Sequence, residues 1–317
     1  MPRLLTVTPN PAIDVTYTVP RQAVGETLRV TDVQRRAGGK GLNVARVIRA
    51  LGRDAATVQP LGGDTGRWIA DELVAAGLPV IPCAVSGRSR TTVAVVDGIA
   101  HPTLYAEPGA ALTRAEWSDV TDTVAAACRP GDWAIVAGSF PPGSSADDLT
   151  RLVHAAHRSG ARVAVDTSGP LLVAAADAGA DLVKANEAEI AEATGTSRIE
   201  AGMDALARGG ATVMMSRGAQ GALLREPSGA VLRRSAVEGI AGNPTGAGDA
   251  ATAGLVMALA EGHDGTTALA WAALCGAAAV LAPVAGEIDP ALIPALAERA
   301  GLPHDLLLPL PPERSTS

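Results

Sequence analysis

The sequence predicts an α/β protein in which a mostly parallel central sheet is covered by helices on both faces, with a small separate β sheet. Strands and helices alternate regularly from residue 114 onward, which is typical of a parallel sheet. Several early strands follow one another without an intervening helix, which indicates the separate sheet. Hydrophobic residues make up 47% of the 317 residues, but only four Trp, two Tyr and one Phe are aromatic, so the core is built from Ala, Val, Leu and Ile.

Strand patterns are prominent in the first part of the chain. The first strand ends at Pro9-Asn10-Pro11, and two later segments alternate apolar and polar residues imperfectly, as half-exposed strands do. A hairpin is predicted around Asp97-Gly98. The predicted strands of this part are Leu4–Thr8, Val15–Val19, Thr27–Val33, Thr91–Val96 and Thr103–Ala106.

The first helix is predicted over Gly41–Leu51. Its apolar residues Val44, Val47 and Ile48 have helical spacing, and Gly52 ends it. Further strands are predicted at Ala56–Leu61, Trp133–Ala137, Arg162–Val165, Asp181–Lys184 and Ala211–Ser216, and further helices at Thr65–Ala76, Arg114–Ala127, Ser145–Ser159, Glu187–Ala193, Asp249–Glu261 and Thr266–Leu281.

Net charge and composition argue against nucleic-acid and membrane partners. Net charge is −7, from 26 basic and 33 acidic residues, and no basic stripe occurs, so nucleic acid is not expected to bind. Thr266–Gly286 carries no charge and is long enough for a bilayer, but Ala dominates it and Gly276 and Pro283 lie inside it. This segment is therefore predicted to be a tightly packed core helix, and no membrane partner is expected.

The cysteines and the N-terminus indicate a cytoplasmic protein. Cys83, Cys128 and Cys275 are odd in number and far apart, which argues against a disulfide framework and a clustered zinc site. The first ten residues contain an apolar stretch too short for a signal peptide.

The strongest chemical signal is Gly246-Ala247-Gly248-Asp249, which precedes an apolar helix. Small residues let backbone N–H groups converge on an anion, and the helix N-terminus adds a positive dipole end. At the mouth of that anion hole, Asp249 could accept a proton from a hydroxyl group while the N–H groups stabilise a transferring phosphoryl group. An ordinary helix with a favourable Asp in its first turn is the alternative.

A second glycine cluster, Ala37-Gly38-Gly39-Lys40-Gly41-Leu42-Asn43, opens the first predicted helix. It could bring backbone and an ammonium group close to a polar ligand, or it could be a flexible loop with a solvated lysine. Neither cluster has the P-loop pattern. Gly246, Gly248 and Ala251 match a relaxed dinucleotide pattern, although the acidic residue expected about twenty residues later is missing.

Together, and in this order, the two clusters resemble the ribokinase/PfkB family of carbohydrate kinases over nearly the whole chain. Its sugar-phosphate branch, with 1-phosphofructokinase and tagatose-6-phosphate kinase, is the most similar. The further segments that resemble this branch are Thr8-Pro9-Asn10-Pro11-Ala12-Ile13-Asp14, Gly138-Ser139-Phe140-Pro141-Pro142-Gly143 and Val165-Asp166-Thr167-Ser168-Gly169.

On the sugar side, the resemblance implies that Asp14 binds sugar hydroxyls and that Arg90 reaches the substrate phosphate, for which a guanidinium is suited. A surface Asp at a strand start and a solvated hairpin Arg are the alternatives. The resemblance also implies residues that hold the sugar and its phosphate: Gly38, Gly39, Lys40 and Asn43.

On the nucleotide side, Lys184, Asn186 and Glu189 match a family stretch that supports the ATP phosphates and the water shell of Mg²⁺, so Glu189 would act on the metal indirectly, through water. A helix start capped by Asn186 is the alternative. The residues that match the nucleotide-binding strand and turn are Ser216, Gly218 and Gly221. Asp166 lies at a strand end, where a structural role in forming the turn explains an Asp as well as a role in the site does.

Three residues differ from the family pattern, and these differences bear on the affinity for the nucleotide and on a monovalent-cation site. Ala185 stands where the branch has Pro, and Arg217 replaces an apolar residue, so donor affinity could differ. Asn243 begins Asn-Pro-Thr where the family more commonly has Asp-Thr-x, which puts a monovalent-cation site in doubt.

The resemblance implies a ribokinase-like fold, with residues 1–317 as a single kinase domain and a small β lid formed by about 14–36 and 88–108. Lids of this family close over the sugar and often pair, so a homodimer through the lid is expected. The Pro- and Ser-rich segment Leu302–Ser317 is predicted to be a loose tail.

The implied activity is phosphorylation of a sugar-phosphate hydroxyl with ATP and Mg²⁺, with Asp249 as base and Gly246, Ala247 and Gly248 as the anion hole. Lys40 favours 1-phosphofructokinase, which converts fructose 1-phosphate to fructose 1,6-bisphosphate, or tagatose-6-phosphate kinase over the minor 6-phosphofructokinase. More distant alternatives are a free-sugar or nucleoside kinase, a non-catalytic sugar sensor, and a nicotinamide oxidoreductase.

Overall fold

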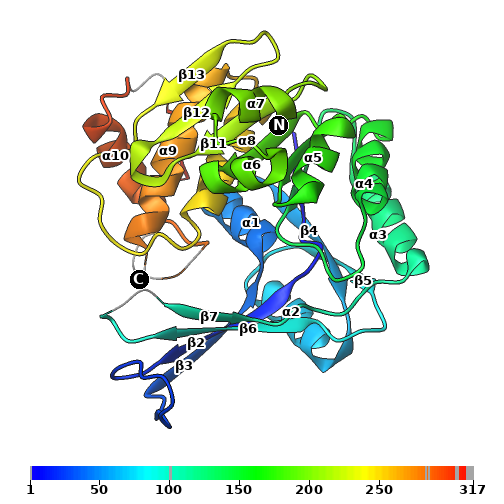
Figure 1. Ribbon diagram of the computed structural model, residues 1–317, viewed down its shortest axis with the longest axis vertical. Helices are drawn as coiled ribbons and strands as arrows, with labels where there is room; N and C mark the ends of the chain where they lie inside the picture. Colours follow the sequence, from blue (N-terminus) through cyan, green and yellow to red (C-terminus); the bar gives the residue numbers. More distant parts are fainter. Residues whose placement is uncertain (1, 100–101, 283, 285, 304–306, 312–317) are drawn as a thin grey trace.

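The computed structural model describes residues 2–311 except 100, 101, 283, 285 and 304–306. Two sheets are present, a large one within the main body and a small one beside it (Figure 1). The strands are β1 (Leu4–Val7), β2 (Ala12–Thr18), β3 (Asp32–Gly38), β4 (Ala55–Leu61), β5 (Val80–Ala84), β6 (Arg90–Val96), β7 (Thr103–Ala106), β8 (Trp133–Ala137), β9 (Arg162–Asp166), β10 (Leu182–Asn186), β11 (Thr212–Ser216), β12 (Ala222–Arg225) and β13 (Val231–Arg234). The α-helices are α1 (Lys40–Ala50), α2 (Gly63–Ala75), α3 (Arg114–Ala127), α4 (Ala146–Arg158), α5 (Pro170–Asp177), α6 (Glu187–Thr194), α7 (Ile199–Leu206), α8 (Ala247–Ala260), α9 (Gly265–Leu281) and α10 (Ile293–Arg299).

The large sheet has nine strands in the order β13-β12-β11-β10-β9-β8-β1-β4-β5. The seven strands from β11 to β5 pair in parallel, whereas β12 and β13 add an antiparallel edge. This confirms the predicted mostly parallel sheet. Because the carboxyl ends of parallel strands meet at one edge, this edge is where a ligand site is expected.

Helices cover both faces of the large sheet, as predicted, and each face has its own hydrophobic cluster. Leu4 of β1 belongs to the cluster that includes residues of α1, α2, α8, α9 and α10, whereas the next residue, Leu5, belongs to the cluster that includes residues of α3 to α7. Such alternation along a strand that is buried on both sides explains its continuous apolar run.

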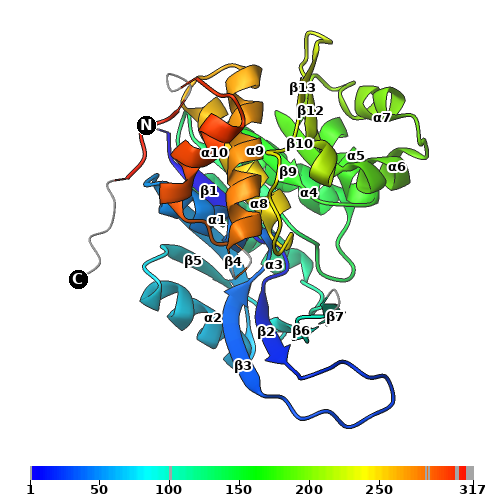
Figure 2. The same ribbon diagram turned by 90° about the vertical axis from the view of Figure 1, so that its left-hand side faces the viewer.

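The uncharged segment 266–286 forms most of α9, which packs along α8 (Figure 2). Small residues allow this close approach, since a Cβ atom on Gly254 would lie only 2.5 Å from the Trp271 carbonyl oxygen. Trp271 is 1% exposed, so the helix belongs to the core, as predicted. Within the described residues, we find no helix with the length and apolar content needed to cross a membrane.

The small sheet has the order β3-β2-β6-β7 and projects from the main body (Figure 2). The predicted strand Thr27–Val33 is wrong: β3 runs from Asp32 to Gly38 instead. Antiparallel pairing with β2 sets these bounds, because Thr18 lies opposite Asp32 and Ala12 opposite Gly38. The glycine cluster therefore continues directly from a strand into α1.

The C-terminal segment is described only over 302–303 and 307–311 of the predicted tail, 302–317. Within it, Leu308 is buried and the Pro309 carbonyl accepts a hydrogen bond from Arg53 Nη1 at 2.7 Å. The remaining residues of the predicted tail lie outside the described part.

Candidate active site

The candidate site lies where the carboxyl ends of β1, β9 and β10 meet the starts of α1 and α8, next to the small sheet. Each of these positions follows from the parallel topology, which collects strand ends and helix starts at one edge. Two of the predicted motifs, the glycine cluster before α1 and the Gly-Ala-Gly-Asp segment at α8, come together here although about 200 residues separate them.

Asp249 lies in the first turn of α8. Gly246 precedes the helix with φ +82°, a left-handed conformation that favours glycine. The Asp249 side chain is 7% exposed and accepts a hydrogen bond from Asn43 Nδ2 at 2.8 Å. Burial and the nearby Asp166 charge raise its pKa to about 6, against the lowering effects of Lys184, Asn43 and Lys40. A buried carboxylate with this pKa can accept a proton near neutral pH.

Asp166, at the end of β9, is the centre of a buried charge cluster. It is fully buried, and its carboxylate accepts hydrogen bonds from Lys40 Nζ at 3.0 Å, Lys184 Nζ at 2.8 Å and Thr252 Oγ1 at 3.0 Å. Burial alone would raise its pKa, but the two ammonium groups outweigh that effect and lower the pKa to about 2. The Asp166 charge, with a smaller contribution from Glu189, raises the pKa of Lys40 above its usual value against the lowering effect of burial.

Sequence reasoning undervalued Asp166 and missed Thr252. The sequence shows Asp166 at the end of the apolar strand Arg162–Asp166. A structural role in the following turn explains an Asp at that position equally well. Thr252 follows Asp249 by three residues, and its hydroxyl also donates to the Gly248 carbonyl at 3.0 Å. Its role depends on a contact across 86 residues, which no local pattern encodes.

The start of α8 faces Lys184. A Cβ atom on Gly248 would lie 3.1 Å from Lys184 Nζ, so glycine allows this approach. The Ala247 N–H group donates to the Pro244 carbonyl at 3.1 Å and is therefore used inside the turn in this structure. Positive charge at this helix start thus comes from the helix dipole together with Lys184 and Lys40.

The glycine cluster packs against Asp14. A Cβ atom on Gly38 would overlap the Asp14 carboxylate, and Gly39, with φ +120°, directly precedes α1. Burial raises the pKa of Asp14, while Arg90, Arg46 and Arg36 lower it in that order. The predicted sugar-side residues Asp14, Gly38, Gly39, Lys40 and Asn43 are thus neighbours.

Arg90, the first residue of β6, joins three segments. Its Nε donates to the Asn10 carbonyl at 3.1 Å, its Nη1 to the Glu107 carbonyl at 3.0 Å, and its Nη2 to Ser139 Oγ at 3.5 Å. Burial lowers its pKa, against the raising effects of Asp14 and Glu107. The guanidinium group is therefore not a freely solvated hairpin arginine.

Asn186 and Glu189 form a capping box at the start of α6. Asn186 Oδ1 accepts from the Glu189 N–H group at 2.9 Å, and Glu189 Oε2 accepts from the Asn186 N–H group at 2.8 Å. The capping alternative is therefore correct as a structural role. Glu189 Oε1 also lies 3.7 Å from Lys40 Nζ, so the same side chain reaches the site.

Ser216 ends β11 and lies beside Asn186 of β10. Gly218 and Gly221, with φ of +54° and +86°, form the turn into β12. Two of the residues that differ from the family pattern lie here. Arg217, in this turn, donates to Glu187 Oε2 at 2.8 Å, and Ala185 of β10 is fully buried.

The third residue that differs from the family pattern, Asn243, accepts from the Thr245 N–H group at 3.0 Å and so stabilises the turn before α8. In the described part of the chain, no group of three or more His, Cys, Asp and Glu side chains is placed to hold a metal ion.

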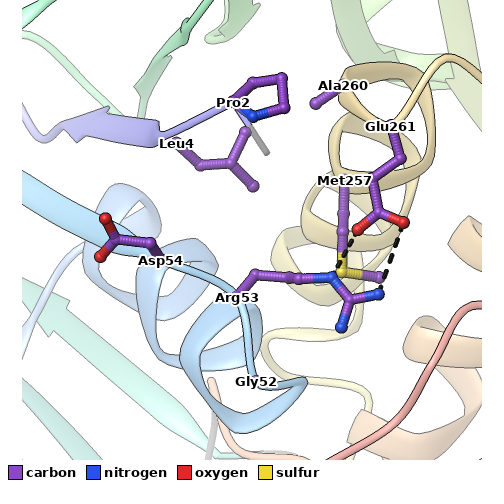
Figure 3. A pocket seen from close by; sticks show the side chains of 8 residues that line it. All are labelled: Pro2, Leu4, Gly52, Arg53, Asp54, Met257, Ala260 and Glu261. Atoms are coloured by element: carbon purple, nitrogen blue, oxygen red, sulfur yellow. Dashed lines mark hydrogen bonds and ion pairs between the residues drawn. The ribbon is translucent and has the colours of Figure 1, made fainter.

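A cavity of about 250 Å³ lies away from this site, beside the first residues of β1 and the end of α8 (Figure 3). The Arg53–Glu261 ion pair forms part of its lining (Figure 3). It contains none of the predicted site residues.

Two lysines beside the start of α8 and a buried carboxylate supply the positive charge and the base that a phosphoryl-transfer enzyme uses. The family model for pfkB carbohydrate kinases matches residues 8–292. The chain belongs to the pfkB family of carbohydrate kinases.

Similar curated proteins are phosphofructokinases. The chain is 37% identical to the 1-phosphofructokinase of Rhodobacter capsulatus, over 92% of this chain and 93% of the relative. It is 34% identical to the ATP-dependent 6-phosphofructokinase isozyme 2 of Mycobacterium tuberculosis, over 89% of this chain and 85% of the relative. The enzyme is accordingly a sugar-phosphate kinase of the phosphofructokinase type.

Solved structures confirm the ribokinase-like fold. The phosphofructokinase-2 of Escherichia coli, in its tetrameric inhibited form, is 29% identical with a TM-score of 0.86, over 94% of this chain and all of that chain. The complex of the same enzyme with fructose-6-phosphate has a TM-score of 0.85 at 29% identity, with the same coverage. The ribokinase of Arabidopsis thaliana, complexed with ribose and ATP, is 20% identical with a TM-score of 0.72, over 93% and 99%.

The nicotinamide alternative is not supported. A dinucleotide fingerprint requires a strand directly before its glycines, but β13 ends at Arg234, and residues 235–246 contain no strand. The glycines before α8 therefore do not form a dinucleotide fingerprint.

Proposed function

We propose that this kinase transfers the γ-phosphoryl group of ATP to a hydroxyl of fructose 1-phosphate and forms fructose 1,6-bisphosphate. The observation that carries the proposal is Asp249, a buried carboxylate at a helix start, held by Asn43 and next to two lysines. The choice of fructose 1-phosphate is supported by Lys40 within Gly-Gly-Lys-Gly and by the identity to a 1-phosphofructokinase.

In the proposed reaction, Asp249 accepts the proton as the sugar hydroxyl oxygen attacks the γ-phosphorus, and the bond between that phosphorus and the β,γ-bridging oxygen breaks to release ADP. No covalent enzyme intermediate is needed. Asn43 donates to Asp249 Oδ2, which orients the carboxylate toward the acceptor. A pKa of about 6 leaves most of Asp249 ionised at neutral pH.

The phosphoryl group is proposed to lie over the start of α8. Gly246, Ala247 and Gly248 provide N–H groups there, with the Ala247 group first leaving its turn bond to Pro244. Lys184 and Lys40 add positive charge, and Asp166 holds both ammonium groups in place.

The nucleotide is proposed to extend from α8 toward the end of β11. Asn186, Ser216, Gly218 and Gly221 lie on that side, where glycine turns let a ligand approach the main chain closely. Lys184 and Glu189 are the predicted charged residues of this side, and the Arg217–Glu187 ion pair also lies there.

Mg²⁺ fits the donors of this site. Mg²⁺ keeps several waters and needs only one or two carboxylates when phosphates supply other oxygens. Glu189 Oε1 is the oxygen that remains outside the capping box, so Glu189 would hold the ion through water. When bound, the ion would neutralise charge on the ATP phosphates.

On the sugar side, Asp14, Gly38, Gly39 and Asn43 are proposed to bind sugar hydroxyls, and Arg90 the phosphate. Asp14 and Arg90 come from β2 and β6 of the small sheet, which supports a lid that closes over the sugar and excludes water.

The lid is proposed to span about residues 14–36 and 88–108 and to pair in a homodimer. A cytoplasmic location is also proposed, since all three cysteines are free and buried.

A second candidate function is phosphorylation of fructose 6-phosphate. It is supported by 34% identity to a 6-phosphofructokinase, and tagatose-6-phosphate kinase activity is the related alternative. All three reactions would use the same base and the same nucleotide side.

An ADP-release assay across fructose 1-phosphate, fructose 6-phosphate, tagatose 6-phosphate and fructose tests the proposal. We expect the highest kcat/KM with fructose 1-phosphate. A higher value with another sugar phosphate would replace the substrate, and a preference for free fructose would contradict the sugar-phosphate assignment.

Arg90→Ala tests the phosphate site. Loss of a charge-assisted hydrogen bond should raise KM for the sugar phosphate by roughly 10- to 150-fold, while KM for ATP and turnover of free fructose stay nearly unchanged. Arg90 also bonds two carbonyl groups, so thermal unfolding is measured in parallel. Equal losses with both acceptors would make Arg90 structural only.

A further inference from the structure

Gly286, which follows α9, lies against the amide that holds Asp249. Gly286 has φ +72°, and a Cβ atom built on it would overlap Asn43 Oδ1. The Asn43 amide therefore lies between the Gly286 main chain on one side and the Asp249 carboxylate, 2.8 Å from Nδ2, on the other. No side chain larger than hydrogen fits at Gly286 without moving this amide.

Glu287, the next residue, is anchored to the small sheet. Glu287 Oε1 lies 3.1 Å from Arg36 Nη2, and Arg36 lies opposite Asp14 in the pairing of β3 with β2. Four contacts thus link Asp14, on the sugar side, to Asp249: the strand pairing, the ion pair, the packing on Asn43 and the Asn43–Asp249 hydrogen bond.

We propose that Gly286 is a positioning residue for the reaction: its main chain holds the Asn43 amide in the orientation that donates to Asp249, and Glu287 fixes Gly286 in place through Arg36. The proposal rests on the proposed function, because it requires Asp249 to be the base. It assigns a role to a segment far from both glycine motifs in the sequence.

The charged groups that face Asp249 give this proposal a pH signature. Asp166 of β9 raises the pKa of Asp249, whereas Lys184 of β10 and Lys40 of α1 lower it. The Asn43 hydrogen bond also lowers the pKa of Asp249. Displacing Asn43 alone should therefore move the acidic limb of the pH–rate profile to higher pH, since the other three groups remain.

Gly286→Ala is the direct test, and Gly229→Ala is its control. Gly229 also has positive φ, +92°, but an added Cβ there meets nothing within 4 Å, so the control has the same backbone penalty without the contact. We expect Gly286→Ala to lower kcat at pH 7 by about 10- to 100-fold, as for a lost charge-assisted hydrogen bond, with the acidic limb shifted upward. The control should keep the wild-type profile.

Glu287→Gln provides a second variant that is expected to fold, since Glu287 is 49% exposed. Glu287→Gln should also lower kcat and move the acidic limb to higher pH. The loss of kcat should stay below about fivefold, as for an exposed ion pair. A wild-type pH profile in both Gly286→Ala and Glu287→Gln would overturn the proposal.

A double-mutant cycle shows whether Gly286 acts through Asn43. In an Asn43→Ala background, Gly286→Ala should cause little further loss of kcat, because the amide that it displaces is already gone. Additive losses would overturn the proposal. If Asp249→Asn retains turnover, the base assignment fails instead, so the two failures are distinguishable.

Discussion

Asp249 and Asp166 are two buried carboxylates in one site, and their surroundings shift their pKa values in opposite directions. Asp166 has two lysine partners within 3.0 Å and stays ionised, whereas Asp249 has an amide partner and feels the negative charge of Asp166. Opposite shifts of this kind separate a permanently charged group from one that can exchange a proton.

Asp249→Asn keeps the shape of the side chain but removes the proton acceptor. We expect kcat to fall by roughly 10²–10⁴. For the wild type, kcat/KM should rise with pH up to about 6, the pKa of Asp249, and then level off.

The same variant should be at least as stable as the wild type. The folded pKa of Asp249 is about 6 and its ordinary value is 3.8, so the folded state loses stability as pH rises between them. Asp249→Asn removes this loss and should raise the free energy of unfolding at pH 8 by up to about 3 kcal/mol. A variant that is both inactive and destabilised in denaturant titrations would not support the base role.

Asp166→Asn should destabilise the fold instead. It leaves Lys184, whose side chain is 5% exposed, without its counter-charge, which costs about 3–5 kcal/mol. Because the pKa of Asp166 is about 2, its contribution is present above pH 4 and is lost as pH falls toward 2.

A double variant and a matched control test this account by urea unfolding. Adding Lys184→Met to Asp166→Asn should recover part of the stability. Asp132→Asn alters a buried carboxylate whose hydrogen bonds, within the described residues, come from the backbone N–H groups of Arg3 and Arg129, so its cost should be smaller. Equal costs would contradict the charge-pair explanation.

At the scale of elements, α1 and α8 lie side by side in parallel and are tied at both ends. Asn43 and Asp249 join their starts at the site, and Arg53 and Glu261 join their ends beside the cavity (Figure 3). Arg53 also donates to the Pro309 carbonyl, so the C-terminal segment packs at this end.

Glu261→Gln should reduce stability and leave kcat nearly unchanged. Arg53 and Glu261 are 9% and 13% exposed, so removing one charge leaves the other buried and costs about 3 kcal/mol. Glu200→Gln, in an ion pair with Arg233 that is more than 60% exposed on both sides, should change stability by less than about 1 kcal/mol. A loss of kcat without a loss of stability would show that this end influences the site.

The sequence predicted the elements with strong periodicity or strong end signals, but not those fixed by pairing partners. The bounds of Arg114–Ala127 and Trp133–Ala137 are those expected. Strand β3 was misplaced because Arg35 and Arg36 hide its pattern and β2 decides its register. Short elements such as α5, α7 and β13 were missed because few residues carry their periodicity.

The site was predictable only in part, because some of its residues stand in local motifs and others depend on contacts between distant segments. Lys40 and Asp249 stand in local glycine motifs, which the sequence displays directly. Asp166 and Gly286 depend on contacts across 126 and more than 200 residues, so only the fold reveals them.

At the scale of the whole molecule, the small sheet is open on both edges. Val15, Val93 and Tyr105 lie side by side on one of its faces, and Tyr105 is 63% exposed. Val15 on that face is 5% exposed and belongs to the core, so the exposed apolar surface is at the edge strand β7, where Leu104 and Tyr105 are each 63% exposed. Exposed apolar side chains of this kind favour association. We expect a homodimer through this sheet, measured by light scattering.

Tyr105→Glu should weaken that dimer. Val231→Glu, at an exposed apolar residue on β13 of the other sheet, is the control and should not affect the mass. A monomeric wild type at high protein concentration would contradict the prediction, and so would a Tyr105→Glu variant with unchanged association.

The small sheet is made from two separate stretches of chain, β2–β3 and β6–β7, and its central pairing, β2 with β6, joins them. An attempt to transfer acceptor preference from a related kinase could therefore not exchange one of these stretches alone. Exchanging only residues 12–38 would pair a foreign strand with the resident β6 across seven positions, from Ala12 with Arg90 to Thr18 with Val96. Because acceptor binding is proposed for Asp14 on β2 and Arg90 on β6, both stretches would have to be exchanged together to keep this pairing intact.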